Sequence, residues 1–267
     1  MSASGAESGV ALLGQTVIGW FNYVADLIAL IVLAFRDLVV MRREGRVATS
    51  GVVARQILFT GVDALPVMSA IALMIGVIVI TQAGTQLPKV GAGAQIGTII
   101  VVTVIRELGP LLTMFIVVGR SGSAITTELG YMSVRREIAA LELMGVSVSR
   151  FIVMPRMIGM ILSMICLTLY FDMVAVLGGF ILARIKMTVP FAAFGTAVAK
   201  SLEVTDLVVT ATKGTLFGAA VAAICCHHGL SVKESMTEIP QQTTRAMINC
   251  LKICLVLDII VTAIAYF

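Results

Sequence analysis

Residues 106–156 read RELGPLLTMFIVVGRSGSAITTELGYMSVRREIAALELMGVSVSRFIVMPR. An apolar run from Leu108 to Val118 leads into a polar, helix-prone segment, Glu128 to Met144, and a second long apolar run begins after Arg156. Gly145 suits the left-handed position just past a helix end. Two interpretations stay open. The charged segment is either a helix that docks on a partner or an ordinary cytoplasmic loop whose basic residues follow the positive-inside rule.

The composition decides the fold class. Of the 267 residues, 59% are hydrophobic and 13% are charged, and the mean hydropathy is +1.05. A soluble domain carries about 25% charged residues, so this chain lacks the polar surface that a globule needs in water. The apolar runs are continuous and far longer than the alternating segments of a transmembrane barrel. We therefore expect an all-α integral membrane protein.

The apolar runs predict five spans, each near the roughly 20 residues that cross the hydrocarbon core. Their predicted ranges are 57–81, 96–118, 157–181, 207–226 and 246–266. Pro66 predicts a kink near the start of the first span. Residues 11–35 form either a sixth span or a helix in the membrane surface, and Gln15, Asn22 and Asp26 within the run favour the interfacial helix.

Basic residues set the expected orientation and the division of the chain. Residues 36–55 and 120–156 each contain five Arg, whereas the turn at 84–95 has one Lys. Both Arg-rich segments are therefore predicted to be cytoplasmic, and the C-terminus to face the other side. We expect a disordered tail, the interfacial helix and a basic cytoplasmic segment in residues 1–55, and a single membrane domain in residues 56–267.

Ionisable residues within the spans are the candidate functional residues, because a charge in the bilayer core is costly and usually has a role. They are Arg106, Glu107, Asp172, Lys213, Lys252 and Asp258. Glu107 is a candidate partner for Lys213, and Arg106 for Asp258. These charges either lock the helices together as ion pairs or line a substrate cavity that receives a charged lipid head group, and the two interpretations overlap.

The sequence gives an enzyme little support. It has no phosphate-binding loop, nucleophile elbow or HExxH motif, so ATP hydrolysis or an ion gradient has to be supplied from outside the chain. The five Cys lie in or beside apolar runs without zinc-finger spacing, which favours small buried hydrophobes over a metal site. We expect no metal bound by the chain and no nucleic acid among its partners.

The 106–156 stretch resembles the signature of the MlaE (YrbE-type) permease family, the membrane subunits of bacterial ABC systems that move phospholipids between the inner and outer membranes. The resemblance covers nearly the whole chain from about residue 55. The matching residues are Arg106-Glu107-Leu108-Gly109-Pro110, Gly119-Arg120, Gly122-Ser123-Ala124, Glu128-Leu129-Gly130, Met132, Ile138, Leu141-Glu142, Met144, Pro155-Arg156, Asp206-Leu207, Lys213, Thr243-Thr244-Arg245 and Asp258.

The resemblance implies a permease subunit that passes phospholipids between the inner membrane and a periplasmic MCE-type carrier and so maintains outer-membrane lipid asymmetry. It implies a homodimer with a lipid cavity at the dimer interface. Because unpaired charges in the bilayer core are expensive, we predict that Arg106, Glu107, Lys213 and Asp258 form a polar set inside an otherwise apolar cavity. A cytoplasmic ABC ATPase that holds ATP and Mg, a STAS-domain protein and a periplasmic ring of MCE-domain subunits are the implied partners. The implied location is the bacterial inner membrane, with the C-terminus periplasmic.

The resemblance also implies that residues 131–144 are a coupling helix seated in the ATPase. Ser133 is a candidate N-cap, and Val134, Ile138 and Leu141 share one face that fits an apolar groove. The other expected contact residues are Glu128, Arg135, Arg136 and Glu142. The family often reads Thr-Glu-Gln-Ile-Asp where this chain has Arg135-Arg136-Glu137-Ile138-Ala139, so we expect poor interchange with another system's ATPase.

An ion- or proton-coupled carrier is the alternative function, with Glu107, Asp172 and Asp258 as a relay. A purely structural membrane anchor is a third interpretation, which the intramembrane charges disfavour. Co-purification separates the first two, because a permease brings an ATPase and a carrier does not.

Overall fold

The computed structural model describes residues 23–34, 36, 43–91, 95–183, 191–233 and 235–266, and every element of secondary structure within these ranges is helical. Five helical stretches are long and apolar enough to cross a membrane: Ser50–Gln86, Ile96–Val134, Ser149–Ile181, Val204–Leu230 and Glu238–Tyr266. The predicted all-α membrane class and the five spans are confirmed. The helices extend well past the predicted ranges, because their polar end turns continue the helix beyond the apolar run.

The first span is bent near its start, as Pro66 predicts. Helix α2 (Arg43–Thr60) is followed by the 3-10 turn η1 (Val62–Ala64) and by α3 (Leu65–Gln86), which has Pro66 in its first turn. Pro is tolerated there because the first turn of a helix leaves its N–H groups without partners. Helix α2 runs through residues 55 and 56, where the chain was expected to divide; that division stays a prediction.

Two π-helical segments interrupt the second span. It consists of α4 (Ile96–Ile100), η4 (Val101–Leu108), α5 (Gly109–Val117), η5 (Val118–Gly122) and α6 (Ser123–Val134), and both η segments are π-helical. The backbone N–H of Gly109 bonds the carbonyl of Val104, five residues earlier. π-helical turns are frequent at functional sites, and η4 contains Arg106 and Glu107, two of the predicted functional residues.

The third span also contains π-helical turns. It is built from η6 (Ser149–Val153), α8 (Met154–Met173), η7 (Val174–Gly178) and α9 (Gly179–Ala183), of which η6 and η7 are π-helical. Gly76 of α3 and Gly179 of α9 let the first and third spans approach closely. A Cβ at Gly179 would lie 2.6 Å from the carbonyl carbon of Gly76, so a larger residue would force the helices apart.

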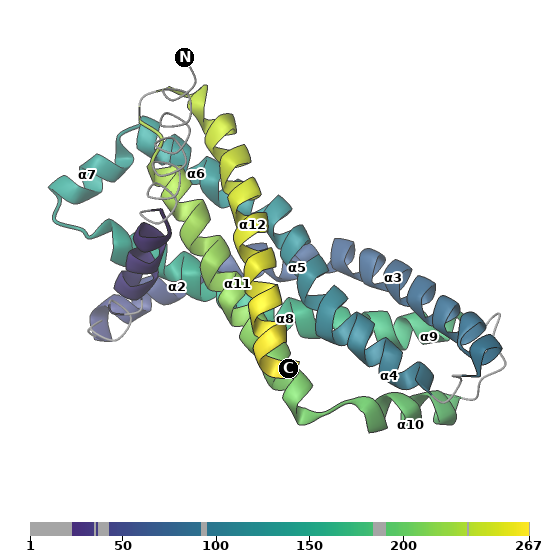
Figure 1. Cartoon of the computed structure of the whole chain (residues 1–267). Coiled ribbons are helices and arrows are strands. Elements are labelled where there is room, and N and C mark those ends of the chain that lie inside the picture. Colours follow the sequence, from purple (N-terminus) through teal and green to yellow (C-terminus); the bar gives the residue numbers. More distant parts are fainter. Residues whose placement is uncertain are drawn as a thin grey trace, which may run out of the picture.

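Helix α11 (Val204–Leu230) is the centre of the bundle and packs on α8, α6 and α12 (Glu238–Tyr266). Figure 1 shows α11 and α12 side by side along most of their length. The shorter helix α7 (Glu137–Leu143) lies at one end of the molecule, whereas α10 (Phe191–Ser201) and the turn η2 (Pro88–Val90) lie towards the other.

The described part of the N-terminal helix, Tyr23–Ala34, is too short to cross a bilayer. At 1.5 Å per residue it is about 18 Å long, against a hydrocarbon core of about 30 Å. Its anchor is the Tyr23 hydroxyl, 3.1 Å from Nε2 of His228 and 3.4 Å from Nδ2 of Asn249. Residues 11–22 lie outside the described residues, and the interfacial placement of this helix stays a prediction.

Candidate functional site: a buried ion network and an exposed connecting helix

Lys213 of α11 is the centre of a charged network inside the bundle. Its side chain is fully buried, and its ammonium lies 2.8 Å from Oδ1 of Asp258 in α12 and 3.4 Å from Oε2 of Glu107 in η4. Thr262 donates a hydrogen bond of 3.0 Å to Oε1 of Glu107. A buried ammonium is tolerated only when it is paired and hydrogen-bonded. Lys213 therefore ties the second, fourth and fifth spans together.

Arg106 forms a second pair beside this network. Its Nε lies 2.8 Å from Oδ1 of Asp206, and its guanidinium carbon is 4.3 Å from the ring centre of Tyr266. The Tyr266 hydroxyl donates to Oδ1 of Asp206 at 2.8 Å. Asp206 is almost fully buried and also accepts the backbone N–H of Glu203 at 3.0 Å, which closes a capping box at the start of α11. One carboxylate thus caps a helix and holds Arg106.

The structure brings together three of the four predicted polar residues, Glu107, Lys213 and Asp258, and the expected Glu107–Lys213 pair is confirmed. The alternative pair of Arg106 with Asp258 is wrong, because Arg106 turns to Asp206. Adjacent residues on a helix point about 100° apart, so Arg106 and Glu107 serve different partners. Asp206 was absent from the predicted set because it reads as a loop residue; the signal that finds it is Glu203 three residues earlier.

The two other acidic and basic residues predicted inside spans lie apart from the network. Asp172 is buried against Gly109, and neither of its carboxylate oxygens has a hydrogen-bond partner among the described residues. Lys252 lines an apolar cavity of about 610 Å³ between the N-terminal helix, α11 and α12. The described residues contain no group of three or more His, Cys, Asp or Glu side chains that could hold a metal ion.

The connection between the second and third spans differs from the predicted single helix 131–144. Helix α6 continues the second span to Val134. The helix is then interrupted at Arg135 and Arg136, and α7 begins at Glu137. Arg136 has φ 59° and ψ 19°, a left-handed conformation that costs a non-glycine residue about 1–2 kcal/mol. Gly145 has φ 77°, as its position past a helix end predicts.

Ser133 is not the N-cap of this connection. It lies inside α6, and its hydroxyl donates to the carbonyl of Val232 in the loop before α12. This bond ties the end of the second span to the loop between the fourth and fifth spans. The predicted start of the helix failed because a tertiary partner competes for the Ser133 hydroxyl.

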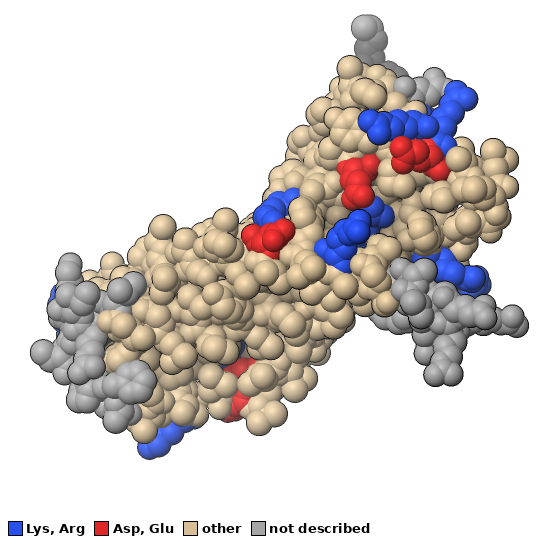
Figure 2. Space-filling view, turned by 180° about the vertical axis from the view of Figure 1, so that it is seen from behind, with Lys and Arg blue, Asp and Glu red and all other residues tan. Residues whose placement is uncertain are grey.

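The apolar face predicted to enter a partner points mostly towards the chain itself. Ile138 and Leu141 are partly buried and pack on the core, whereas the Leu143 side chain is 90% exposed and Met144 is 68% exposed. Glu142 is exposed, as expected for a contact residue. Figure 2 shows charged side chains gathered towards one end of the molecule, next to a long tract with few charges. Leu143 and Met144 are thus exposed apolar side chains at the end of α7. The tract with few charges is suited to contact with lipid.

The comparison with known families identifies the chain. The family described as Permease MlaE matches residues 53–264. The chain belongs to the MlaE permease family. The match covers all five spans, the ion network and the α6–α7 connection, and it confirms the resemblance seen in the 106–156 stretch.

Relatives of this MlaE-family chain extend the match over most of its length. A probable ABC transporter permease protein of Rickettsia typhi is 30% identical over 214 residues, 80% of this chain and 83% of that protein. The intermembrane phospholipid transport system permease protein MlaE of Haemophilus influenzae is 29% identical over 213 residues, 79% and 82% of the two chains. The chloroplastic protein TRIGALACTOSYLDIACYLGLYCEROL 1 of Arabidopsis thaliana is 25% identical over 204 residues, 76% and 58% of the two. The chain is thus a multi-pass membrane permease of the ABC transporter class.

Proposed function

We propose that this chain is the permease subunit of an ABC transporter that moves phospholipids between the bacterial inner membrane and a periplasmic MCE-type carrier, and so maintains outer-membrane lipid asymmetry. The observation that carries the proposal is the family match over residues 53–264, together with a relative of similar length that is named for intermembrane phospholipid transport. The network around Lys213 adds a physical reason, since charges held within a bundle commonly mark a substrate pathway.

Glu107 is the residue through which the network would meet a lipid. Its side chain is 35% exposed and that of Arg106 is 20% exposed, whereas Lys213 and Asp258 are buried beneath them. Two cavities formed by the described residues, of about 650 and 610 Å³, are lined by other side chains. Because the Glu107 side chain is partly exposed on the single chain, a second copy could complete a lipid cavity around it, in keeping with the implied homodimer.

The remaining partners follow from the same proposal. A cytoplasmic ABC ATPase would hold ATP and Mg and seat the α6–α7 connection, a STAS-domain protein would bind the ATPase, and a ring of MCE-domain subunits would stand on the periplasmic side. The Arg-rich ends of α2 and α6 would then face the cytoplasm and Tyr266 the periplasm. If residues 11–35 form an interfacial helix, a cysteine placed at Ser4 should react with a membrane-impermeant reagent only from the cytoplasmic side, and periplasmic labelling would show that these residues span the membrane instead.

Purification in mild detergent tests the proposal. Mass spectrometry of the eluate should identify an ABC ATPase, a STAS-domain protein, MCE-domain subunits and bound phospholipid. In a reconstituted system, lipid transfer should depend on ATP, and Glu107→Ala should impair transfer or assembly. Wild-type transfer and complex yield after single alanine changes at Arg106, Glu107, Lys213 and Asp258 would exclude the polar set as a functional site.

An ion-coupled carrier is the competing function, and one observation bears on it. Asp172 is buried without a hydrogen-bond partner among the described residues, an arrangement that suits a proton-carrying group, but the other two relay carboxylates, Glu107 and Asp258, both pair with Lys213. Transport by the purified chain alone, driven by a pH gradient and abolished by Asp172→Asn, would favour the carrier. Dependence on the ATPase, with Asp172→Asn unaffected, would favour the permease.

A further inference from the structure

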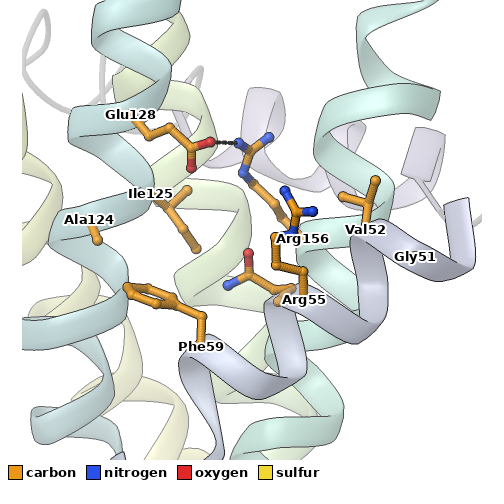
Figure 3. A pocket seen from close by; sticks show the side chains of 9 residues that line it. Gly51, Val52, Arg55, Phe59, Ala124, Ile125, Glu128 and Arg156 are labelled. Atoms are coloured by element: carbon orange, nitrogen blue, oxygen red, sulfur yellow. Dashed lines mark ion pairs between the residues drawn. The ribbon is translucent and has the colours of Figure 1, made fainter. Parts of the chain in front are cut away.

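A groove with two arginines lies apart from the Lys213 network. It has a volume of about 650 Å³ and is open between α2 and α6 above the start of α8 (Figure 3). Its lining residues are Gly51, Val52, Arg55, Gln56, Phe59, Ala124, Ile125, Glu128 and Arg156. None of these belongs to the ion network, so the groove is a separate feature of the molecule.

The groove is held open by contacts at its base. Helix α2 approaches α8 closely at Gly159, where an added Cβ would lie 2.7 Å from Cβ of Gln56. Arg120 donates a hydrogen bond of 2.6 Å to the carbonyl of Phe59, and its guanidinium carbon lies 5.0 Å from the Phe59 ring centre. These contacts fix α2 against the second and third spans at the level of Phe59. The space between α2 and α6 above Phe59 is not filled by these contacts.

The charged side chains that line the groove have an excess of positive charge. The Arg156 side chain is 9% exposed, and its Nη2 lies 2.9 Å from Oε1 of Glu128, whose side chain is 60% exposed. Arg55, on the facing wall, is exposed and has no ion pair with another described residue. A buried guanidinium needs an anionic partner, but this partner is open to solvent and exchangeable. The three side chains together carry a net charge of +1.

We infer that this groove binds the phosphodiester of a phospholipid from the adjacent leaflet, with Arg55 and Arg156 on the phosphate. Guanidinium groups match phosphate oxygens by paired, charge-assisted hydrogen bonds, and one phosphodiester neutralises the net charge. Val52, Phe59 and Ile125 offer apolar surface to the first part of an acyl chain, which a free phosphate ion would leave unused. Glu128, released from Arg156, then faces the ammonium of an amine-bearing head group.

This lipid site is additional to the cavity that contains Glu107, and it rests on the proposed function only in its choice of a phospholipid as ligand. It would lie at the end of the bundle that carries the α6–α7 connection. Binding would replace the Glu128–Arg156 pair, which joins α6 to α8 on either side of that connection. Occupancy of the groove would thereby be sensed by the segment expected to meet the ATPase.

A tryptophan reporter tests the site directly. The chain has one tryptophan, Trp20, so a Trp20→Phe, Phe59→Trp variant has its only indole at the groove. Dibrominated phosphatidylethanolamine added in detergent should quench this indole saturably. Arg55→Gln should raise the half-saturating lipid concentration roughly tenfold, since a hydrogen bond to a charged group is worth at least that factor. Lys89→Gln, the same kind of change in the exposed turn η2, should leave the curve in place.

Three further arms make the outcome decisive. Glu128→Gln should shift the preference from phosphatidylethanolamine towards brominated phosphatidylglycerol. Inorganic phosphate at millimolar concentration should displace the lipid poorly, and equal competition would overturn the lipid assignment in favour of a soluble anion. Equal quenching in the Arg55→Gln and Lys89→Gln variants would overturn the site itself. If the reporter variant misfolds, native mass spectrometry of lipid bound to the Arg55→Gln and Lys89→Gln chains gives the same comparison.

The proposed function and this site fail separately. Glu107→Ala should impair lipid transfer but leave groove quenching unchanged, because Glu107 does not line the groove. Groove quenching that follows Arg55 in a protein without ATP-dependent transfer would keep the site and reject the transporter. ATP-dependent lipid transfer that survives Arg55→Gln, in a protein whose quenching is also unaffected by this change, would keep the transporter and reject the groove as a lipid site.

Discussion

The Lys213 ammonium donates a hydrogen bond of 2.8 Å to the backbone carbonyl of Arg106, 107 residues earlier in the chain. In a regular helix this carbonyl would accept the N–H of residue 110, but that residue is Pro110 and has none. The lysine thus supplies the donor that the proline removes. It also forms an ion pair with Glu107, the next residue, so one side chain contacts both a backbone carbonyl and a carboxylate of the second span.

Lys213→Met should destabilise the fold strongly. It would leave the buried Asp258 carboxylate and Glu107 without a cation and the Arg106 carbonyl without a donor, and breaking a buried pair costs about 3–5 kcal/mol. We expect a large loss of thermal stability in detergent and a low yield of folded chain.

A double variant separates charge from packing. Lys213→Met with Asp258→Leu removes both partners of the 2.8 Å pair and should be less destabilised than the sum of the single changes. Strict additivity of the two single effects would show that Lys213 and Asp258 are not energetically coupled.

The exposed end of α7 should carry the contact with the ATPase. Leu143→Asp would place a charge on the most exposed apolar side chain of the connection and should reduce retention of the ATPase roughly tenfold, while the thermal stability of the free chain stays unchanged. A pull-down at several salt concentrations measures this loss. Ser147→Asp, an exposed polar position in the same connection, is the matched control.

Ile138→Asp should behave differently from Leu143→Asp. Because Ile138 packs against the core of its own chain, the new charge should lower thermal stability as well as ATPase retention. The opposite result would be loss of the ATPase in Ile138→Asp with unchanged thermal stability, and normal ATPase retention in Leu143→Asp. It would assign the docking face to Val134, Ile138 and Leu141, as the spacing in the sequence predicts.

The left-handed residue Arg136 should respond to substitution by backbone conformation rather than by charge. Arg136→Gly should preserve or increase the protection of α7 amides in hydrogen exchange, because Gly adopts φ 59° without strain. Arg136→Val should reduce it by about 1–2 kcal/mol, since a β-branched residue resists this conformation. Arg135→Val is the control, because Arg135 has an ordinary φ of −76°; similar losses at both positions would point to charge instead.

The N-terminal helix should loosen when its tyrosine hydroxyl is removed. Burial raises the pKa of Tyr23 to about 12, so at neutral pH the group is a phenol able to donate towards His228. Tyr23→Phe should cost about 1 kcal/mol and expose the helix to limited proteolysis several-fold faster. Tyr131→Phe, at an exposed position of α6, should not change the cleavage rate. Equal rates in all three proteins would mean that the hydroxyl contributes nothing to docking.

Part of the ion network can be predicted from the sequence. The intramembrane residues Glu107 and Lys213 were expected to pair because each is too costly to leave alone in a bilayer. The partner of Arg106 could not be predicted in this way, since Asp206 is 100 residues away and lies outside the predicted apolar run. The helix face at Ile138 was assigned by spacing, and spacing cannot tell which neighbour a face meets.

The sequence by itself determined that this is a helical membrane protein with five spans, because hydrophobic length and charge content act locally along the chain. Local chemistry also placed the bend near Pro66 and the left-handed Gly145. Only the tertiary structure decided that Lys213 reaches the carbonyl freed by Pro110, that Arg106 turns to Asp206, and that the connection breaks at Arg136. Each of these depends on which helices become neighbours, a choice made by packing across the whole bundle rather than by any one segment.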